Sequence, residues 1–304
     1  MSEAAPGRVG LFVIGAMKCG STTLYDLLAA HPQICMCREK EPAHFVGPEA
    51  IGRLRPSRTK RWWTTEDYHS LFEPAPRTRI WGEASTFYTR LPLATGVAER
   101  IHAYNPDARI IYIVRNPFAR TVSHYHHDYR EGSERRKILQ AVTEEPQYLD
   151  LSDYAMQLAP FRDQFPHEHI KILILERFQR RQEDTIDSIC DWLGLDRPMR
   201  GEETARHAVH VTERRVGPMR GGLRREHLLG LWDSAPWRAF SRAAPPWMKE
   251  SLRTLVYARR IDTKDVPYDR LRALVGDRLS DMAARFREMT GDDLPEWRTG
   301  PAGL

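Results

Sequence analysis

Residues 11–28 constrain the fold of this chain more than any other stretch. Four apolar residues at 11–14 end at Gly15, a polar loop follows, and Ser21 then opens a segment with leucines at helical spacing. This order predicts a buried strand, a loop bounded by glycines, and the start of a helix. The exposed N–H groups and the positive dipole end of such a helix form an anion site suited to phosphate.

The loop differs in one respect from the phosphate loop of NTPases, which reads G-x-x-x-x-G-K-[ST]. Gly15 and Gly20 have the required spacing, but Ser21 follows the second glycine and the lysine lies earlier, at Lys18. A lysine inside the loop reaches a different part of a bound anion than one on the first helical turn. A nucleotide kinase with an unusual loop therefore stays open as an interpretation at this point.

Composition is that of an ordinary globular enzyme, since 41% of the 304 residues are hydrophobic and 29% are charged. The net charge of +5 suits anionic ligands and is weak support for nucleic-acid binding. Four scattered cysteines are too few for a disulfide framework, and we expect reduced thiols. The first residues do not have the order of a signal peptide, and no apolar run has the length of a membrane span. These features predict a cytoplasmic location.

Strands alternate with helices along most of the chain, which predicts an α/β fold with a parallel sheet. The strongest strand is Arg109–Val114, whose run of β-branched residues indicates burial on both faces. Further strands are expected at 33–36, 79–83 and 169–175. Helices are expected at 65–72, Val97–Tyr104, 118–129, 185–193, 227–232, 248–258 and 268–289.

A second candidate anion site follows the strongest strand. Arg115 comes directly after Val114, and Ser123 lies eight residues further on, in the next helix. Ligands of parallel α/β sheets bind at the carboxyl ends of the strands, so Lys18 and Arg115 are expected to face one crevice. Two anion sites at one sheet edge indicate a ligand with two phosphate-bearing positions.

The two motifs together resemble the PAPS-dependent sulfotransferases, in the branch that contains the heparan sulfate enzymes and many bacterial homologues. They read GAMKCGSTTL at 15–24 and VRNPFARTVSHY at 114–125. The resemblance extends to shorter segments at 40–45, 81–85, 154–158, 165–166, 189–195 and 294–297. It implies a P-loop NTPase-like three-layer sandwich with a central parallel sheet and a helical C-terminal cap. We expect a single domain over 1–304, in which 45–80 and 200–265 are excursions that cover substrate and cofactor.

The resemblance also implies the donor and its ligands. The donor is PAPS (3′-phosphoadenosine 5′-phosphosulfate), whose 3′-phosphate is held by Arg115 and Ser123. A late basic loop at Arg214, Arg215 and Gly217 matches, more loosely, one that closes over the same phosphate. The residues that hold the 5′-phosphosulfate are Lys18, Cys19, Gly20, Ser21, Thr22 and Thr23.

The candidate bases come from the segment at 40–45. Glu41 matches the glutamate that serves as base in the polysaccharide branch, although it could instead be an exposed loop acid. His44 is a second candidate for a base or an acceptor contact, and a packed loop histidine is the alternative. Glu83 could face the cleft or brace its loop. We expect no metal, because His124 and His127 share a helical face without a third ligand.

The implied reaction is sulfuryl transfer from PAPS to a hydroxyl of a small-molecule, lipid or carbohydrate acceptor, with release of PAP, as in enzymes of class EC 2.8.2. The heparan sulfate enzymes have a lysine where this chain has Ala84, which favours a smaller or less charged acceptor than a sulfated polysaccharide. Two alternatives stay open: a kinase-like NTPase that uses Mg²⁺ and ATP, and a non-catalytic protein that binds sulfated glycans through 206–225. The acceptor, the choice between O- and N-sulfation, and the oligomeric state are not fixed by the sequence.

Overall fold

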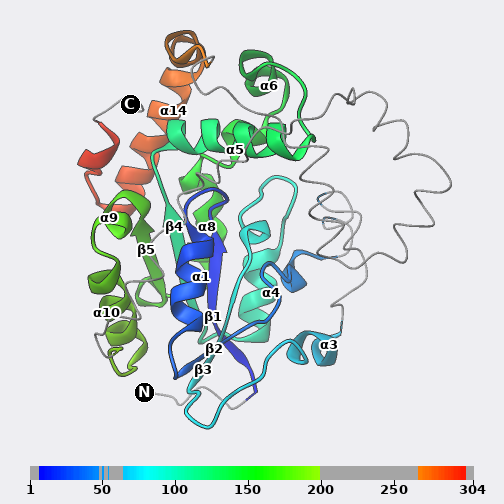
Figure 1. Cartoon of the computed structure of the whole chain (residues 1–304), viewed down its shortest axis with the longest axis vertical. Helices are drawn as coiled ribbons and strands as arrows, with labels where there is room; N and C mark the ends of the chain where they lie inside the picture. The colour runs from blue at the N-terminus through cyan, green and yellow to red at the C-terminus, as the bar shows by residue number, and fades with distance from the viewer. Residues whose placement is uncertain (1–6, 48–49, 51–53, 55–63, 199–265, 299–304) are drawn as a thin grey trace, which may run out of the picture.

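The computed structural model describes residues 7–47, 50, 54, 64–198 and 266–298. Within these ranges, five parallel strands form one sheet in the order β2-β3-β1-β4-β5 (Figure 1). The strands are β1 (Val9–Gly15), β2 (Ile34–Met36), β3 (Ile80–Ala84), β4 (Arg109–Val114) and β5 (Ile170–Ile174).

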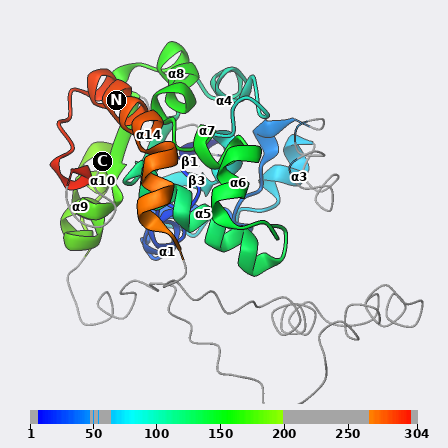
Figure 2. The same cartoon turned by 90° about the horizontal axis from the view of Figure 1, so that it is seen from above.

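Helices cover both faces of the sheet. α1 (Ser21–Ala29) connects β1 to β2 on one face, whereas α4 (Val97–Tyr104) and α8 (Tyr154–Gln164) lie side by side on the other (Figure 2). Parallel crossovers are right-handed, so connections that run in opposite directions along the sheet place their helices on opposite faces. The predicted three-layer α/β sandwich with a central parallel sheet is confirmed.

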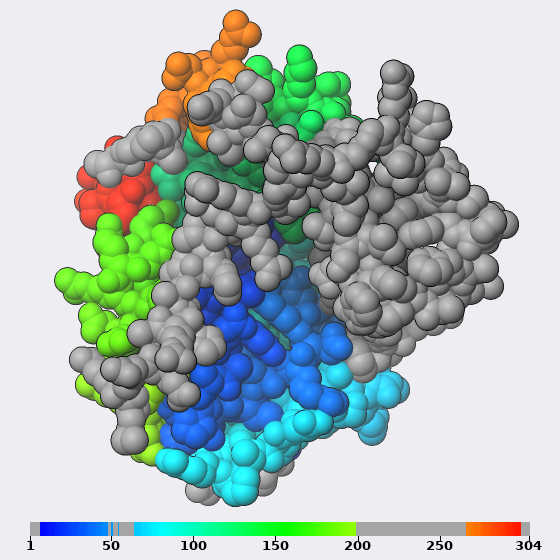
Figure 3. Space-filling model, viewed as in Figure 1, coloured from blue at the N-terminus to red at the C-terminus, as the bar shows by residue number. Residues whose placement is uncertain are grey.

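The two central strands are the most buried part of the core. Every residue of β1 is buried, and so is every residue of β4 after Arg109. Both strands are covered by helices on each face, which explains their nearly continuous apolar sequence. In the space-filling view, the blue side chains of the N-terminal elements occupy the middle of the face that carries α1 (Figure 3).

Helix boundaries follow the local capping signals. α5 (Pro117–Glu131) begins after Asn116, whose side chain accepts a hydrogen bond from the Ala119 N–H at 3.0 Å, and ends at Gly132 in the left-handed region. α3 (Thr65–His69) begins in the same way, because the Thr64 side chain accepts from the Asp67 N–H. α10 (Gln182–Leu193) starts three residues earlier than predicted and ends at the predicted Gly194.

Several short elements were not predicted. Among these, α8 contains Pro160, and its buried face includes the polar Gln157, so its sequence lacks a continuous apolar stripe. The other helices are α6 (Ile138–Glu144), α7 (Gln147–Asp150) and α9 (Leu175–Arg180), and the 3₁₀ turns are η1 (His44–Val46), η3 (Thr86–Tyr88), η4 (His167–His169) and η7 (Pro295–Trp297).

The C-terminal part of the described chain packs on the helical layers. α14 (Tyr268–Thr290) contacts α5, α6 and α8, and Trp297 is fully buried against Tyr154 and Phe286. This confirms the predicted helix at 268–289 as part of the cap. The helices expected at 227–232 and 248–258 lie outside the described residues, as do the whole excursion at 200–265 and part of the one at 45–80. The single-domain organisation stays a prediction.

Candidate anion-binding and catalytic site

The loop between β1 and α1 has the backbone that a close anion contact requires. Gly20 caps α1 with φ 90°, and a Cβ at this position would lie 2.6 Å from Leu175 Cδ1. Leu24 N–H donates to the Gly20 carbonyl at 3.1 Å, so the helix begins directly at the end of the loop. The first N–H groups of α1 therefore point out of the carboxyl edge of the sheet, where an anion can accept from them.

Two of the three predicted catalytic residues, Lys18 and Glu41, share an uncommon backbone conformation. Lys18 has φ 68° and Glu41 has φ 62°, and only Ala43 and Leu294 join them as non-glycine residues with positive φ in the described ranges. Such conformations cost about 1–3 kcal/mol each and persist where the surrounding structure imposes them, which is often at functional sites. This feature separates Lys18 and Glu41 from ordinary loop residues.

The loop side chains divide into buried and accessible groups. Ser21 is buried, Thr22 is exposed and Thr23 is half-buried at the start of α1. The Cys19 side chain points into the core, where its Sγ lies 3.7 Å from the Tyr154 hydroxyl, and burial raises the pKa of this thiol to about 11. The Cys19 N–H donates to the Ala16 carbonyl at 3.2 Å, and the predicted contact of Cys19 with a ligand stays a prediction.

Arg115 lies against the same loop, as expected from its place after β4. Its Nη1 approaches the Lys18 carbonyl oxygen at 3.4 Å, and the Tyr154 hydroxyl donates to the Arg115 carbonyl at 2.7 Å. Its Nε is buried and has no hydrogen-bond partner among the described residues. A buried N–H of a cation without a partner is costly unless a ligand accepts from it, so Arg115 fits an anion. Ser123 is half-buried on the second turn of α5, the helix that Arg115 precedes.

The charges around Lys18 are mainly positive. Burial lowers the pKa of the Lys18 ammonium, and the charges of Arg130 and Arg115 lower it further, while Asp128 acts in the opposite direction. None of the ion pairs within the described ranges involves Lys18, Arg115 or Arg130. Such a group of half-buried cations is electrostatically unfavourable by itself and is relieved by an anion.

Glu41 is held at the carboxyl end of β3, beside β1. Its N–H donates to the Ala84 carbonyl at 2.9 Å, and its Oε1 accepts from the Thr86 hydroxyl at 3.0 Å and from Lys40 Nζ at 3.3 Å. Because β1 and β3 are parallel neighbours, Glu41 and Lys18 belong to the same edge of the sheet. A carboxylate fixed in this way can accept a proton at this edge.

His44 and Glu83 are the two remaining candidates near Glu41: His44 begins η1, three residues after Glu41, and Glu83 lies in β3. The His44 ring stacks on Tyr68, with ring centroids 4.3 Å apart and nearly parallel planes, and its suggested role as a second base stays a prediction. Glu83 is completely buried, and its Oε1 accepts from the Tyr68 hydroxyl at 2.6 Å and the Tyr88 hydroxyl at 2.7 Å. Burial raises the pKa of the Glu83 carboxyl to about 7. Of the two interpretations of Glu83, these contacts favour bracing.

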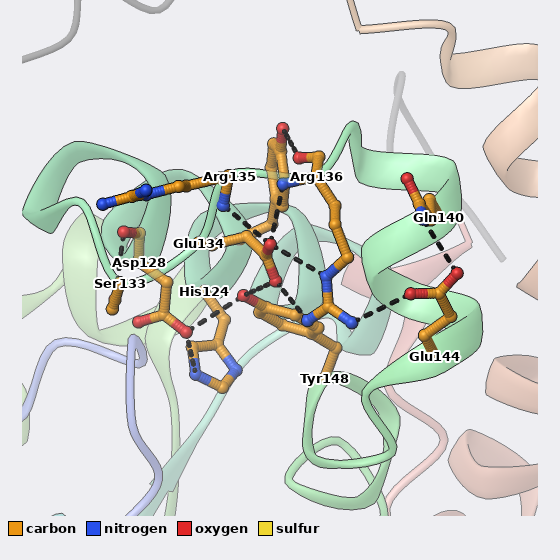
Figure 4. Close-up of polar contacts among 10 residues, drawn as sticks. His124, Asp128, Ser133, Glu134, Arg135, Arg136, Gln140, Glu144 and Tyr148 are labelled. Atoms are coloured by element: carbon orange, nitrogen blue, oxygen red, sulfur yellow. Dashed lines mark hydrogen bonds and ion pairs between the residues drawn. The ribbon is translucent and has the colours of Figure 1, made fainter.

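A network of polar contacts holds the C-terminal half of α5 (Figure 4). Arg120 donates to His124 Nδ1 at 3.3 Å, so the imidazole proton lies on Nε2, which faces Asp128 at 3.3 Å. Burial lowers the pKa of His124, so this ring is neutral. The Tyr148 hydroxyl donates to Asp128 at 3.0 Å, and Glu134 accepts from Tyr148 at 3.3 Å.

The far end of this network is the ion pair between Glu134 and Arg136, which closes the turn after α5. Glu134 accepts from the backbone N–H groups of Arg135 and Arg136, both at 2.8 Å, and Arg136 reaches Glu144 of α6 at 3.1 Å.

Sequence reasoning missed the residues of α5 beyond Ser123 that surround Lys18. The available signal was helical spacing, since Arg130 lies seven residues, or two turns, after Ser123.

The remaining predicted site residues cannot be placed. Arg214, Arg215 and Gly217 lie outside the described residues, as does the basic stretch at 206–225 that a glycan-binding protein would use. Among the residues that the structure describes, no three His, Cys, Asp or Glu side chains could hold a metal ion together. Across the same ranges, no helix combines the length and apolarity that crossing a membrane requires.

The sequence of this chain is similar to those of known proteins. Residues 10–199 match the model of the Sulfotransferase family. The human "Carbohydrate sulfotransferase 15" is 29% identical in an alignment 190 residues long that covers 50% of this chain and 33% of the human protein. The "Membrane-associated sulfotransferase kil1" of Dictyostelium discoideum is 34% identical over 116 residues, which are 38% of this chain and 22% of that protein. These matches thus cover no more than a third of either relative.

A solved structure is similar over nearly the whole length. The sulfotransferase from Alicyclobacillus acidocaldarius aligns with a TM-score of 0.64 at 22% identity, covering 96% of this chain and 99% of that protein. At this level of identity the similarity shows a common fold.

Proposed function

This chain belongs to the Sulfotransferase family, and on that premise we propose that it transfers a sulfuryl group from PAPS to a hydroxyl group and releases PAP. The observation that carries the proposal is the pair of cations at two strand ends. Lys18 follows β1, and Arg115 follows β4 with its buried Nε lacking a partner among the described residues. Two anion sites at one edge match a nucleotide that carries phosphate at both the 3′ and the 5′ position.

The residues that would hold the donor fall into two groups. Lys18, Gly20 and the first turn of α1, which includes Ser21, Thr22 and Thr23, would surround the 5′-phosphosulfate. Arg115 and Ser123 would bind the 3′-phosphate, together with Arg214, Arg215 and Gly217. PAPS supplies a sulfuryl group attached to a phosphate leaving group. Lys18 would stabilise the negative charge that grows on the leaving oxygen, and this electrostatic task requires no metal.

Glu41 is the proposed general base. The contacts with Thr86 and Lys40 fix its carboxylate at the edge where Lys18 lies. An acceptor hydroxyl would give its proton to Glu41 as the oxygen attacks sulfur. His44 would then contact the acceptor rather than take the proton, since its ring stacks on Tyr68.

The acceptor is proposed to be a carbohydrate, lipid or small-molecule alcohol. The carbohydrate sulfotransferase among the relatives supports a sugar hydroxyl. Ala84 is almost fully buried and brings no charge to the cleft, which favours an acceptor with little negative charge. We also propose a cytoplasmic location, because all four cysteines are free, as is typical of reducing compartments.

The test combines donor binding with turnover. Calorimetric titration with PAP should give saturable binding without Mg²⁺, and incubation with PAPS should release PAP when an acceptor is present. The acceptor panel contains a neutral oligosaccharide, its uronate-containing counterpart, a long-chain alcohol and a phenol. The NTPase alternative requires Mg²⁺ and ATP, so thermal stabilisation by Mg²⁺-ATP without any by PAP would refute the proposal.

A further inference from the structure

Arg130 is the cation near Lys18 to which neither the sequence motifs nor the proposed function gives a role. It lies in the last turn of α5, which runs from Pro117 to Glu131. It is half-buried, although residues at the end of an exposed helix commonly extend into solvent.

The orientation of Arg130 directs its charge back toward the site. Its Nε donates to the His126 carbonyl oxygen at 3.3 Å, which turns the guanidinium toward the N-terminal end of α5. Ser123 lies two turns earlier on the same side of this helix, because seven residues correspond to nearly two full turns. The guanidinium therefore points along the face that carries Ser123.

The charge of Arg130 is felt at Lys18. After burial, it is the largest cause that lowers the pKa of the Lys18 ammonium, ahead of Arg115. Neither Lys18 nor Arg130 forms an ion pair with a carboxylate within the described part of the chain. The Asp128 carboxylate acts on Lys18 in the opposite direction, but it already accepts from the Tyr148 hydroxyl and lies 3.3 Å from His124 Nε2. Lys18 and Arg130 are therefore half-buried cations whose mutual repulsion a bound anion would reduce.

The turn after α5 keeps Arg130 in place. Gly132 N–H donates to the Tyr129 carbonyl, and the N–H groups of Ser133 and Glu134 both donate to the Asp128 carbonyl, at 3.0 and 3.1 Å. The Glu134 carboxylate then binds Arg136 and Tyr148 (Figure 4). The helix end that carries Arg130 is therefore ordered before any ligand binds, which reduces the entropic cost of using it.

We propose that Arg130 is a further anion-binding residue of the active site, which shares with Lys18 one negatively charged group of a ligand. This rests on the proposed function. The group is either the 5′-phosphosulfate of the donor or an acidic group on the acceptor. Its chemistry is the same in both cases, an oxyanion that accepts from an ammonium and a guanidinium.

The experiment compares Arg130→Gln with Arg135→Gln. Arg135 lies at the same end of α5 and loses the same charge, but its side chain is exposed and only its backbone takes part in the contacts of the turn. Calorimetric titration with PAP should give a dissociation constant at least about tenfold higher for Arg130→Gln, and within twofold of wild type for Arg135→Gln. Arg130→Lys should recover part of the loss, since it keeps the charge without the planar fork.

The source of the anion is decided by a second arm. If PAP binds Arg130→Gln normally, while KM for a uronate-containing oligosaccharide rises tenfold and KM for its carboxyl-reduced form does not, the anion belongs to the acceptor. If neither PAP binding nor KM changes relative to Arg135→Gln, the proposal is wrong.

A third measurement needs no ligand and separates this inference from the proposed function. Reductive ¹³C-methylation followed by an NMR titration reports the pKa of Lys18. This pKa should be higher in Arg130→Gln than in wild type and unchanged in Arg135→Gln. Absence of PAP binding by wild type would refute the proposed function, whereas an unchanged Lys18 titration would refute the shared site.

Discussion

Replacement of Glu83 by glutamine should remove much of the decrease in stability of this protein between pH 5 and pH 8. Glu83 is completely buried, and burial raises the pKa of its carboxyl from 4.5 to about 7 in the folded state. Between these two values the folded chain holds a proton that the unfolded chain has released. Stability therefore decreases as the pH rises through this window and is highest below it.

The size of the effect follows from the two pKa values. The difference between 4.5 and about 7 corresponds to roughly 3 kcal/mol of unfolding free energy, most of which is lost between pH 5 and pH 8. Glutamine keeps the shape of the side chain and an oxygen that can accept from Tyr68 and Tyr88, but it cannot ionise. The variant should therefore gain about 2–3 kcal/mol over wild type on going from pH 5 to pH 8.

The assay is denaturant unfolding at pH 5, 6, 7 and 8, followed by circular dichroism. Glu73→Gln is the matched control, because Glu73 is exposed and pairs with Arg38 at the surface. Its free energy of unfolding should run parallel to that of wild type across this range. Equal pH dependence of Glu83→Gln and wild type would mean that the Glu83 carboxyl stays ionised in the folded protein throughout this range, so burial would not raise its pKa.

Three further predictions concern the site itself. Lys18→Ala should lower kcat at least about 100-fold with an unchanged circular dichroism spectrum, because the charge that stabilises the leaving oxygen is lost; a loss below tenfold would exclude this role. Glu41→Gln should keep PAP affinity within twofold in calorimetry while kcat falls about 100-fold or more, since only proton removal is affected; weaker PAP binding with unchanged kcat would move the base elsewhere. Gly20→Ala should weaken PAP binding and lower the melting temperature, because the new Cβ would lie 2.6 Å from Leu175 Cδ1 at a φ of 90°; wild-type values for both would contradict the described loop.

The sequence predicted the parts of the fold that local patterns determine. β4 has the predicted bounds because its β-branched run is unambiguous, and α5 begins at Pro117 because Asn116 and Pro117 together form a helix start. α8 was missed because Pro160 and the polar Gln157 on its buried face weaken the helical pattern. Such an element is stabilised by the layers around it and not by its own sequence.

The same distinction applies to the candidate site. Lys18 and Arg115 could be brought together from sequence because parallel strands end at one edge. The environment of Glu83 could not be predicted from sequence, because its partners come from α3 and η3 and meet it only in the folded chain. Arg130 was missed because the motif ends near Ser123, although the helix continues beyond it.

The contacts of Asn116 have a consequence for how this protein should be expressed as fragments. Asn116 Nδ2 donates to the Trp297 carbonyl at 3.1 Å, while Asn116 N–H donates to Glu176 of α9 at 2.9 Å. The start of α5 is thus attached to the C-terminal turn, which lies far outside residues 10–199. A recombinant fragment cut at the end of the family match would lose Trp297 and the whole of α14, and it would leave Tyr154 facing solvent beside Arg115. We therefore expect a fragment that ends at residue 199 to be less stable than the full chain, because the start of α5 would lose its contact with Trp297.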